Sequence, residues 1–561
     1  MIKQLKPGLL VSLFLTVSSL ALGQSYGKNG MVVCDNTVAS QVGIEILKKG
    51  GNAIDASVAT AFALAVTHPQ AGNIGGGGFL VYLDSNGKST TIDFREKAPL
   101  SASPTFFLDA EGNFVKGSNR EGLKSVGVPG TVAGLYLAHQ KYGLLPWKEL
   151  IQPAVELAEK GVTLSWTLEQ HAKDFKAGDY PDFLKNYFNN SLGKPTKQGE
   201  TWVQKELANT LKLIRDQGKD GFYKGHVAQE IVSFMKANGG LITLEDLNKY
   251  EAIERKPVKG QYKEFEIIAM PPPSSGGIAL IEMLNMMELA NFDSIQFNSI
   301  EYVHLLAEAM RRAFADRAEH LGDPDFNPDM PVEKLTSKEF AQMRYKNIDF
   351  NRASISDSSK FGQLYDGQNT THLSIIDKVG NSVSLTYTLE QSYGCGLGSP
   401  KLGFLFNNEM GDFNPKPSYT NSGWLIGTPP NIIQPEKRML SSMSPTIITK
   451  NGKPYLIIGS PGGRTIINTV FQTILCVLEY DMPVEKAIAG MKIHHQWMPD
   501  EIVYETNLLS PDTRKSLENM GHSIRGVENL GRLMGIQIME EQRVYKGTAD
   551  SSSPDGGAVG Y

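Results

Sequence analysis

Cysteine is scarce in this chain. Only three cysteines occur among 561 residues, and they lie far apart, at Cys34, Cys395 and Cys476. So few and so scattered thiols exclude a disulfide-stapled scaffold and a cysteine-rich zinc cluster. The fold must therefore be stabilised by a hydrophobic core, which a chain of this length is large enough to form.

A large excess of charge of one sign is also missing. Lys and Arg total 55 and Asp and Glu total 60, which gives a formal net charge of -5. No long basic run is present that could follow a phosphate backbone or bind anionic lipid. We therefore expect no nucleic-acid partner.

The N-terminal residues resemble an export signal. Lys3 and Lys6 precede an apolar stretch that ends in Ala21 and Gly23, small residues at a spacing that a signal peptidase accepts. The stretch is shorter than the roughly 20 residues of a spanning helix, and Ser and Thr interrupt it. Residues 1–23 are thus predicted to be a signal peptide of a periplasmic or secreted protein without a stable membrane span; a membrane anchor is the alternative.

Helix-like and strand-like patterns alternate after this segment, which favours a layered α/β body. Residues 53–66 have the composition of a small-residue helix, and residues 79–83 that of a buried strand. The four glycines at 75–78 precede a strand rather than a helix, and no Gly-Lys-Ser/Thr follows them, so they do not match a phosphate-binding loop. We expect them to allow close backbone packing.

Two hairpins are predicted in the last third of the chain. They pair residues 372–376 with 382–388, and residues 446–449 with 455–458. The second turn contains Asn451 and Gly452, which tolerate the positive φ of a tight hairpin. The Ser- and Gly-rich stretch 351–369 is predicted to be a flexible loop that could tolerate a chain break. Sheet structure is therefore expected to begin at Thr370.

Several short strings carry a family resemblance through their shared order. They are Asp93-Phe94-Arg95-Glu96, 271–277, 315–326, Asn369-Thr370-Thr371-His372, 385–388, 407–410, 441–445, 459–463, 494–499 and 557–561. Each string alone is a weak signal, because it can arise in many loops without function. Together they resemble the γ-glutamyltranspeptidase family over essentially all of the chain after residue 23.

The resemblance implies an α/β (α+β) fold, a four-layer αββα sandwich of the N-terminal-nucleophile hydrolase type. It also implies a precursor that cuts itself between Asn369 and Thr370. The large subunit, 24–369, and the small catalytic subunit, 370–561, would stay together as a heterodimer that forms one αββα body. The implied reaction moves a γ-glutamyl group from glutathione or a similar donor to water, or to an amino acid or peptide, without a cofactor.

The chemistry of threonine gives Thr370 a reason to be the nucleophile. A Thr hydroxyl reacts poorly at neutral pH unless a base takes its proton. Cleavage would supply that base, because the new α-amino group has a pKa of roughly 7.7 to 8.0 and is partly neutral near pH 7.5. The alternative is that Thr370 merely opens a strand, as β-branched residues often do.

Two further elements would complete the implied catalytic group. Thr388 resembles the second threonine of the family, which hydrogen-bonds to the nucleophile, although taken alone it is ordinary strand composition. Gly462 and Gly463 precede the helical run 466–475, so their N–H groups can point outward at a helix N-terminus and form an oxyanion hole. Glycines for a tight strand-to-helix turn would be compatible with that role.

A γ-glutamyl donor carries an α-carboxylate and an α-ammonium, so its pocket needs a cationic and an anionic side. The resemblance assigns Arg95, Ser441 and Ser442 to the carboxylate, and Glu390, Glu409 and Asp412 to the ammonium. Many family members have Asn at the position of Glu390 and Gln at that of Glu409. The acidic residues here keep the role of ammonium acceptor but add negative charge; a solvated surface group is the commoner role of any single carboxylate.

Other motifs favour less specific interpretations. The segment 413–438 resembles a lid loop over the donor pocket, with a plain surface loop as the alternative. No metal is expected in catalysis, because His494 and His495 are adjacent and no ligand pattern flanks them. Cys395 has no basic neighbour in sequence to lower its pKa, so a structural thiol is predicted.

Two rival functions remain open. A cephalosporin or glutaryl acylase of the same superfamily would share the surroundings of Thr370, but it would not need acidic partners for an α-ammonium. An unprocessed, inactive exported binding homologue would not need an intact junction at Thr370 together with Thr388. The acidic group around Asp412 argues against the first rival, and the junction argues against the second.

Overall fold

The computed structural model describes residues 23–356, 370–419, 427–506 and 509–561. Nearly all of the predicted signal peptide, most of the predicted loop before Thr370, and Asn369 itself lie outside the described residues. In the part of the chain that is described, no helix is long and apolar enough to span a bilayer.

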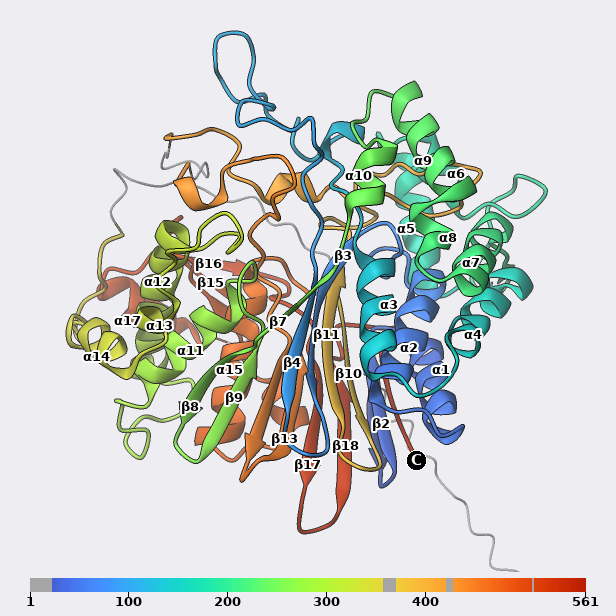
Figure 1. The fold of residues 1–561 in the computed structure, drawn as a ribbon. Helices are drawn as coiled ribbons and strands as arrows, with labels where there is room; N and C mark the ends of the chain where they lie inside the picture. Colours follow the sequence, from blue (N-terminus) through green and yellow to red (C-terminus); the bar gives the residue numbers. More distant parts are fainter. Residues whose placement is uncertain (1–22, 357–369, 420–426, 507–508) are drawn as a thin grey trace, which may run out of the picture.

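Two seven-stranded sheets form the centre of the molecule (Figure 1), and neighbouring strands within each are antiparallel. The first sheet has the order β1 (Gln24–Gly27), β18 (Val544–Ala549), β17 (Met534–Met539), β13 (Lys453–Gly459), β12 (Thr446–Lys450), β9 (Phe265–Ala269) and β8 (Val258–Tyr262). The second has the order β19 (Gly557–Gly560), β2 (Gly30–Cys34), β10 (Thr370–Asp377), β11 (Ser382–Thr388), β3 (Gly77–Leu83), β4 (Ser89–Phe94) and β7 (Ile253–Arg255).

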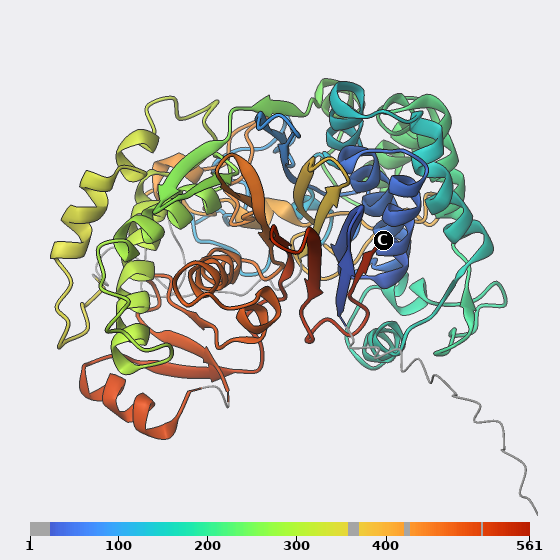
Figure 2. The same cartoon turned by 90° about the horizontal axis from the view of Figure 1, so that it is seen from below.

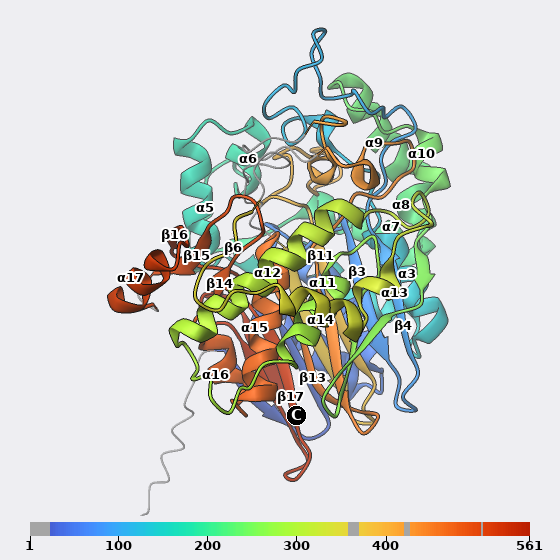
Figure 3. The same ribbon diagram turned by 90° about the vertical axis from the view of Figure 1, so that its left-hand side faces the viewer.

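Helices cover the outer face of each sheet, as the views from below and from the side show (Figures 2 and 3). The second sheet shares its core with α1 (Thr37–Lys48), α2 (Ala53–Thr67), α3 (Thr131–Tyr142), α4 (Trp147–Lys160), α5 (Trp166–Ala177), α6 (Asp182–Tyr187), α7 (Lys205–Gln217), α8 (Asp220–Tyr223), α9 (Gly225–Ala237) and α10 (Leu244–Lys249). The first shares its core with α11 (Gly276–Met287), α12 (Ile300–His320), α13 (Val332–Leu335), α14 (Lys338–Lys346), α15 (Thr465–Glu479), α16 (Val484–Ala489) and α17 (Pro511–Asn519).

Short strands lie outside the two large sheets. They are the pair β5 (Val162–Thr163) and β6 (Thr201–Trp202), and the group β14 (Ile493–His494), β15 (Ile502–Glu505) and β16 (Ile524–Val527). Neither group contributes to the sandwich itself.

The alternation of side chains along β3 shows how the layers are separated. Leu80 and Tyr82 belong to the core beneath α1 to α4, while Phe79 and Val81 belong to the core between the two sheets. Successive side chains of a strand point to opposite faces, so this strand must be covered on both sides. The order of layers is helix, sheet, sheet, helix, and the predicted αββα sandwich is confirmed.

The predicted local elements are present. Helix α2 begins after Asn52, whose side chain accepts from the backbone N–H of Asp55, while the Asp55 carboxylate accepts from the N–H of Asn52. Strands β10 and β11 form the first predicted hairpin, and β12 and β13 the second. Asn451 and Gly452 have φ values of 53° and 75°, as the tight turn requires.

The glycines at 75–78 serve close packing, as the sequence predicts. A Cβ on Gly76 would lie 2.0 Å from the carbonyl oxygen of Thr388, and one on Gly78 would lie 2.4 Å from that of Thr386. Only glycine fits such an approach. Strand β3 and the turn before it therefore pack directly against the end of β11, where Thr388 lies.

Strands from before and after Thr370 lie side by side in both sheets. In the second sheet, β10 and β11 lie between β2 and β3, and in the first, β12 lies beside β9. Each sheet therefore needs hydrogen bonds between residues 24–369 and 370–561. A cut before Thr370 would leave these ladders in place.

Candidate active site

Residues that are far apart in the sequence meet in one pocket, at the end of the sandwich where β10 begins and β11 ends. The pocket encloses about 730 Å³, counting its open mouth. The predicted residues that line it are Arg95, Thr370, Thr388, Glu390, Glu409, Asp412, Ser441, Ser442 and Gly463. Gly462 precedes Gly463 in the same turn, so the structure gathers every described residue of the predicted site.

The two threonines lie opposite each other because of strand register. Thr370 is the first residue of β10, Thr388 is the last of β11, and the ladder pairs them directly. Side chains directly opposite on antiparallel strands are close neighbours. The Thr388 Oγ1 atom accepts a hydrogen bond of 2.9 Å from the backbone N–H of Glu390. The hairpin thus brings the second threonine beside the proposed nucleophile.

A buried carboxylate holds the start of β10. Asp35 Oδ2 accepts from the hydroxyl of Thr371 at 2.8 Å, and Asp35 Oδ1 accepts from the hydroxyl of Ser553 at 2.9 Å. Asp35 follows β2 directly and is fully buried. These bonds tie the residue after Thr370 to the neighbouring strand and to the C-terminal segment.

The glycine turn leads from β13 into α15. Gly462 and Gly463 have positive φ values of 136° and 58°, and the carbonyl of Gly462 accepts from the backbone N–H and the hydroxyl of Thr465. Among the described residues no hydrogen bond uses the N–H of either glycine. These donors at the N-terminus of α15 are of the kind that an oxyanion needs. The role itself stays a prediction.

Arg95 forms ion pairs with three carboxylates. Its guanidinium pairs with Glu409, lies 2.6 Å from Asp412 Oδ2 and 3.7 Å from Glu96, and its Nε donates to the carbonyl of Met439. Burial works against the charge of Arg95, but the three carboxylates raise its pKa above the ordinary range. The sequence predicted a carboxylate clamp separate from the acids, whereas the structure pairs the arginine with those acids.

A second ion pair neutralises the other added acid. The Arg120 guanidinium pairs with Glu390 and also donates to the carbonyl of Gly411 at 3.2 Å. Burial raises the pKa of Glu390 to about 7, although Arg120 opposes the shift. Burial also raises the pKa of Glu409 well above its usual range, against the pull of Arg95. Each extra carboxylate is therefore paired with an arginine, Glu390 with Arg120 and Glu409 with Arg95.

Ser441 and Ser442 are oriented as donors. Ser442 Oγ accepts from Arg317 Nη2 at 3.1 Å, and Ser441 Oγ accepts from the backbone N–H of Met443 at 3.2 Å. Within the described part of the chain, neither hydroxyl donates to an acceptor. Both protons are thus available to a ligand anion in the pocket.

The sequence analysis missed four polar residues of this region: Asp35, Arg120, Arg317 and Arg464. The last two lay beside recognised strings, because Arg317 is inside 315–326 and Arg464 follows Gly463 directly. Their place inside or next to a recognised string is the signal that could have found them. Asp35 and Arg120 stand in segments without such a signal.

The segment predicted to form a lid contributes to the pocket wall. Asn414, Thr428 and Asn431 line the pocket, and the side-chain amide of Asn414 donates to the carbonyl of Thr428 at 2.8 Å. Thr428 Oγ1 also donates to the carbonyl of Ala318, at 2.7 Å. Residues 420–426, with Trp424, lie outside the described residues. Coverage of the pocket by this segment remains a prediction.

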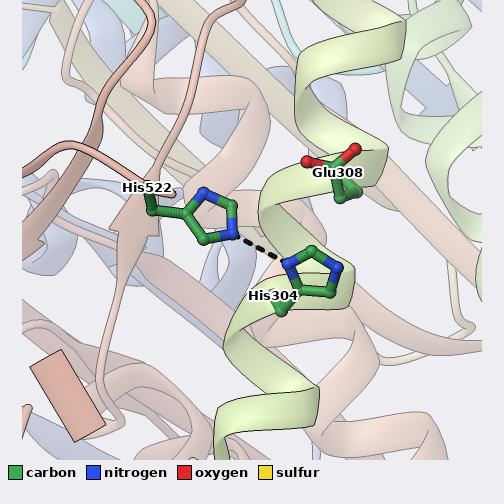
Figure 4. Close-up of side chains that lie close together, drawn as sticks. All are labelled: His304, Glu308 and His522. Atoms are coloured by element: carbon green, nitrogen blue, oxygen red, sulfur yellow. Dashed lines mark hydrogen bonds between the residues drawn. The ribbon is translucent and has the colours of Figure 1, made fainter. Parts of the chain in front are cut away.

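His304, Glu308 and His522 form a buried cluster with possible metal ligands (Figure 4). The nearest nitrogens of the two histidines lie 2.8 Å apart and share a hydrogen bond. Two nitrogens that bind one tetrahedral zinc ion would lie about 3.3 Å apart, since each Zn–N bond is about 2.0 Å. The Glu308 oxygens accept from Arg311 and Arg312, which would repel a cation. The cluster is better described as a hydrogen-bonded network.

His494 and His495 were predicted not to bind a catalytic metal, and Cys395 was predicted to be a structural thiol; all three are buried. His494 bonds to Asn468 at 2.7 Å, and His495 to Asp500 at 3.2 Å. Burial lowers the pKa of His495 to about 4 and raises that of the Cys395 thiol to about 12. All three cysteines are free and buried, so the thiolate form that reacts is disfavoured.

Comparison with known sequences gives one consistent match. A family model described as gamma-glutamyltranspeptidase matches residues 39–560. The glutathione hydrolase proenzyme of Escherichia coli (strain K12) is 43% identical over 541 residues, which cover 95% of this chain and 92% of that protein. The glutathione hydrolase proenzyme of Bacillus subtilis (strain 168) is 39% identical, over 95% of this chain and 92% of that protein. The acylase ACY 1 proenzyme of Pseudomonas sp. (strain SE83) is 34% identical, with 89% and 88% covered.

Solved structures agree in fold. The cephalosporin acylase of Bacillus halodurans superposes with a TM-score of 0.82 at 26% identity, over 96% of this chain and 97% of that one. A chain of Helicobacter pylori gamma-glutamyltranspeptidase has a TM-score of 0.55 at 44% identity. It matches over 96% of its own length but covers only 59% of the present chain.

Proposed function

This chain belongs to the γ-glutamyltranspeptidase family, and we propose that it transfers γ-glutamyl groups from glutathione and related donors to water or to amino-acid and peptide amines. The observation that carries the proposal is a single pocket in which Thr370 and Thr388 lie beside both acidic and basic side chains. A zwitterionic donor needs that combination, because it brings a carboxylate and an ammonium together.

The first proposed step is self-cleavage. The Thr370 hydroxyl oxygen attacks the carbonyl carbon of Asn369, its proton passes to the peptide nitrogen, and the C–N bond breaks to leave an ester. Water then hydrolyses the ester to the carboxylate of Asn369, the free Thr370 hydroxyl and a free α-amine. The relatives from Escherichia coli and Bacillus subtilis are named proenzymes, which supports processing of this kind.

The size of a solved relative also supports the cut. The large subunit would contain residues 24–369, which are 346 of 561 residues or about 62% of the chain. The Helicobacter pylori chain covers 59% of the present chain, which is close to that share. The two parts would stay together as a heterodimer, because strands from both are hydrogen-bonded neighbours in each sheet.

The second step is acyl transfer. The α-amine of Thr370 accepts the hydroxyl proton, the oxygen attacks the γ-carbonyl carbon, and the N–H groups of Gly462 and Gly463 stabilise the oxyanion. The amine returns the proton to the leaving nitrogen as the C–N bond breaks, which leaves a γ-glutamyl ester on Thr370. Water or an acceptor amine then attacks the ester and restores the hydroxyl. Thr388 would hold the nucleophile in line through a hydrogen bond.

Donor orientation would use both sides of the pocket. The hydroxyls of Ser441 and Ser442 can donate to the α-carboxylate, while Glu390, Glu409 and Asp412 can accept from the α-ammonium. Arg95 would hold two of these acids in place and face the carboxylate. Fixing both charged groups of the donor would place its γ-carbonyl against Thr370, which is where orientation contributes to rate.

Export is part of the proposal. Residues 1–23 would direct the precursor to the periplasm or outside the cell, and they would be absent from the mature protein. The N-terminal sequences of the two mature chains would show both cuts, one after residue 23 and one before Thr370.

The rival activity is that of a cephalosporin or glutaryl acylase, which the fold would also accommodate. A glutaryl group lacks the α-ammonium, so it would leave the carboxylates of the pocket without a counter-ion. The buried acids around Arg95 and Arg120 therefore favour a γ-glutamyl donor.

Intact mass and a pair of donors test the proposal together. We expect two chains, the smaller with 192 residues (561 minus 369) and beginning at Thr370. Release of nitroaniline from γ-glutamyl-4-nitroanilide should exceed release from glutaryl-4-nitroanilide. An uncut, inactive chain would support the binding-homologue alternative, and the reverse donor preference would support the acylase.

A further inference from the structure

Arg317 and Ser275 form a hydrogen-bonded pair, here called the brace, that contacts both Ser441 and Ser442. Arg317 Nε donates to Ser275 Oγ at 2.8 Å, and Arg317 Nη2 donates to Ser442 Oγ at 3.1 Å. Ser275 Oγ in turn donates to the carbonyl of Ser441 at 2.6 Å, and the Ser275 backbone N–H donates to the same oxygen at 2.8 Å. One guanidinium therefore fixes the pair at two points.

The brace joins parts of the chain that the proposed cut would separate. Arg317 lies near the C-terminal end of α12, in the helical layer that faces the viewer in Figure 3, and Ser275 directly precedes α11. The serine pair belongs to the segment after Thr370. Processing would leave these contacts as interactions between the two subunits.

The charge of Arg317 has no counter-ion in the described part of the protein. No carboxylate oxygen there lies within 4.0 Å of its guanidinium, in contrast to Arg95 with three such partners. Its exposed fraction is only 7%, yet it lines the pocket. Burial, together with the charges of Arg464 and Arg95, lowers the pKa of Arg317 to about 9 against the opposing effect of Asp412. An anion in the pocket would relieve this cost.

We propose that Arg317 is a second positioning residue for the α-carboxylate of the donor, acting through the hydroxyl of Ser442 and adding its positive charge to that of Arg95, which is shared with three carboxylates. Because Ser442 Oγ accepts from the guanidinium, its own proton is directed to a different acceptor. This inference rests on the proposed function, and it assigns the recognition of one donor group to a residue outside the predicted site.

A matched pair of ligands isolates this effect. L-Glutamate and 4-aminobutyrate share the γ-carboxylate and the amine, and only the first carries an α-carboxylate. We would measure both as competitive inhibitors of γ-glutamyl-4-nitroanilide cleavage, and by calorimetry, for the wild type and for Arg317→Gln. The preference for L-glutamate should fall roughly 10- to 100-fold, the range for a hydrogen bond to a charged group.

Three further variants separate positioning from general damage. Arg317→Lys keeps the charge but cannot reach both serines, and Ser275→Ala removes one contact, so each should reduce the preference less than Arg317→Gln does. Ser442→Ala combined with Arg317→Gln should lose little more than either change alone, because the two residues would act as one unit. Arg312→Gln removes another buried arginine of α12, bound to Glu308, and should leave the preference unchanged.

Each outcome decides the inference. An unchanged ratio in Arg317→Gln, or in Arg317→Lys and Ser275→Ala if the first variant does not fold, would overturn it. An equal loss of both ligands would assign Arg317 a purely structural role and would overturn it as well. If the wild type cleaves the donor but no variant changes the preference for L-glutamate, this inference fails and the proposed function stands. A wild type that neither cleaves the donor nor binds L-glutamate would overturn both.

Discussion

The pocket has two walls that are held in place by different forces. The nucleophile wall, Thr370 and Thr388, is fixed by the backbone ladder between β10 and β11. The donor wall is made of residues outside the strands that are fixed by ion pairs, such as Arg95 with Asp412 and Arg120 with Glu390. A ladder sets positions within the strand register and is insensitive to charge, whereas ion pairs respond to pH and to single substitutions. In the proposed function, the reaction would therefore depend on the wall held by the ladder, and donor specificity on the wall held by ion pairs.

The largest effect is expected at the nucleophile wall. Thr370→Ala should leave one uncut chain and reduce donor cleavage by roughly 10⁴-fold or more, as loss of a nucleophile does in other acyl transferases. Denaturing gels and nitroaniline release would show it. Thr370→Ser keeps a hydroxyl and should still be processed. A cut, active Thr370→Ala protein would remove this residue from the mechanism.

The next effect belongs to the donor wall. Arg95→Lys should lower kcat/KM by about 10- to 100-fold, because lysine cannot bridge Glu409 and Asp412 and leaves buried charge unpaired. The loss should appear mainly in KM, while self-cleavage continues. Steady-state kinetics on the processed variant check this, with Lys453→Arg at the far hairpin as a surface control. An Arg95→Lys enzyme with unchanged KM and kcat would show that the ion-paired wall does not orient the donor.

A smaller effect should follow pH. Burial raises the pKa of Glu390 from its ordinary value of 4.5 to about 7, so in the folded protein its carboxylate ionises as pH rises through about 7. Donor affinity should improve as pH rises through about 7, because ionised Glu390 attracts the ammonium. Glu390→Gln should flatten that limb of the KM profile and change KM only a few-fold at pH 8. A profile that keeps the limb would assign it to another group, such as Glu96.

The same raised pKa predicts the sign of a stability change. A folded-state value above the unfolded one means that ionisation of Glu390 costs folding free energy, and the cost is absent below about pH 4.5 and complete above about pH 7. The Tm of Glu390→Gln minus the Tm of the wild type should therefore be more positive at pH 8 than at pH 5. Thermal unfolding at the two pH values gives the comparison, and an opposite trend would contradict the burial effect.

The smallest effect on activity is expected far from both walls. Gly452→Ala in the β12–β13 turn meets no atom within 4 Å, but it forces an alanine into φ of 75°. The free energy of unfolding should fall by about 1 to 2 kcal/mol. Because the turn lies at the opposite end of β13 from Gly462, kcat/KM should stay within a factor of two. A large kinetic change would mean that the ladder transmits strain to the site.

Much of the nucleophile wall could be predicted from the sequence. The alternating pattern of 382–388 and the turn before it predict the hairpin, and the hairpin places Thr388 opposite Thr370. Glycines and a helical run likewise indicate the turn at Gly462 and Gly463. These features depend on residues within about 25 positions of one another, where periodicity and turn chemistry act.

The donor wall was only partly predictable. Its residue types followed from the resemblance, but their partners did not. Arg120 reaches Glu390 across 270 residues, Arg317 reaches Ser442 across 125, and Asp35 reaches Thr371 across 336. No local pattern encodes such pairs, so the sequence did not predict that Arg95 pairs with Glu409 and Asp412.

By itself the sequence determined the layered class, the two hairpins, the family and the residues of the proposed chemistry, because short-range patterns and ordered motifs are written along the chain. The tertiary structure alone decided which charges neutralise one another, and it leaves Arg317 without a carboxylate within 4.0 Å among the described residues. The physical reason is that burial makes an unpaired charge costly. Whether a charged side chain is paired depends on what the fold places within about 4 Å of it.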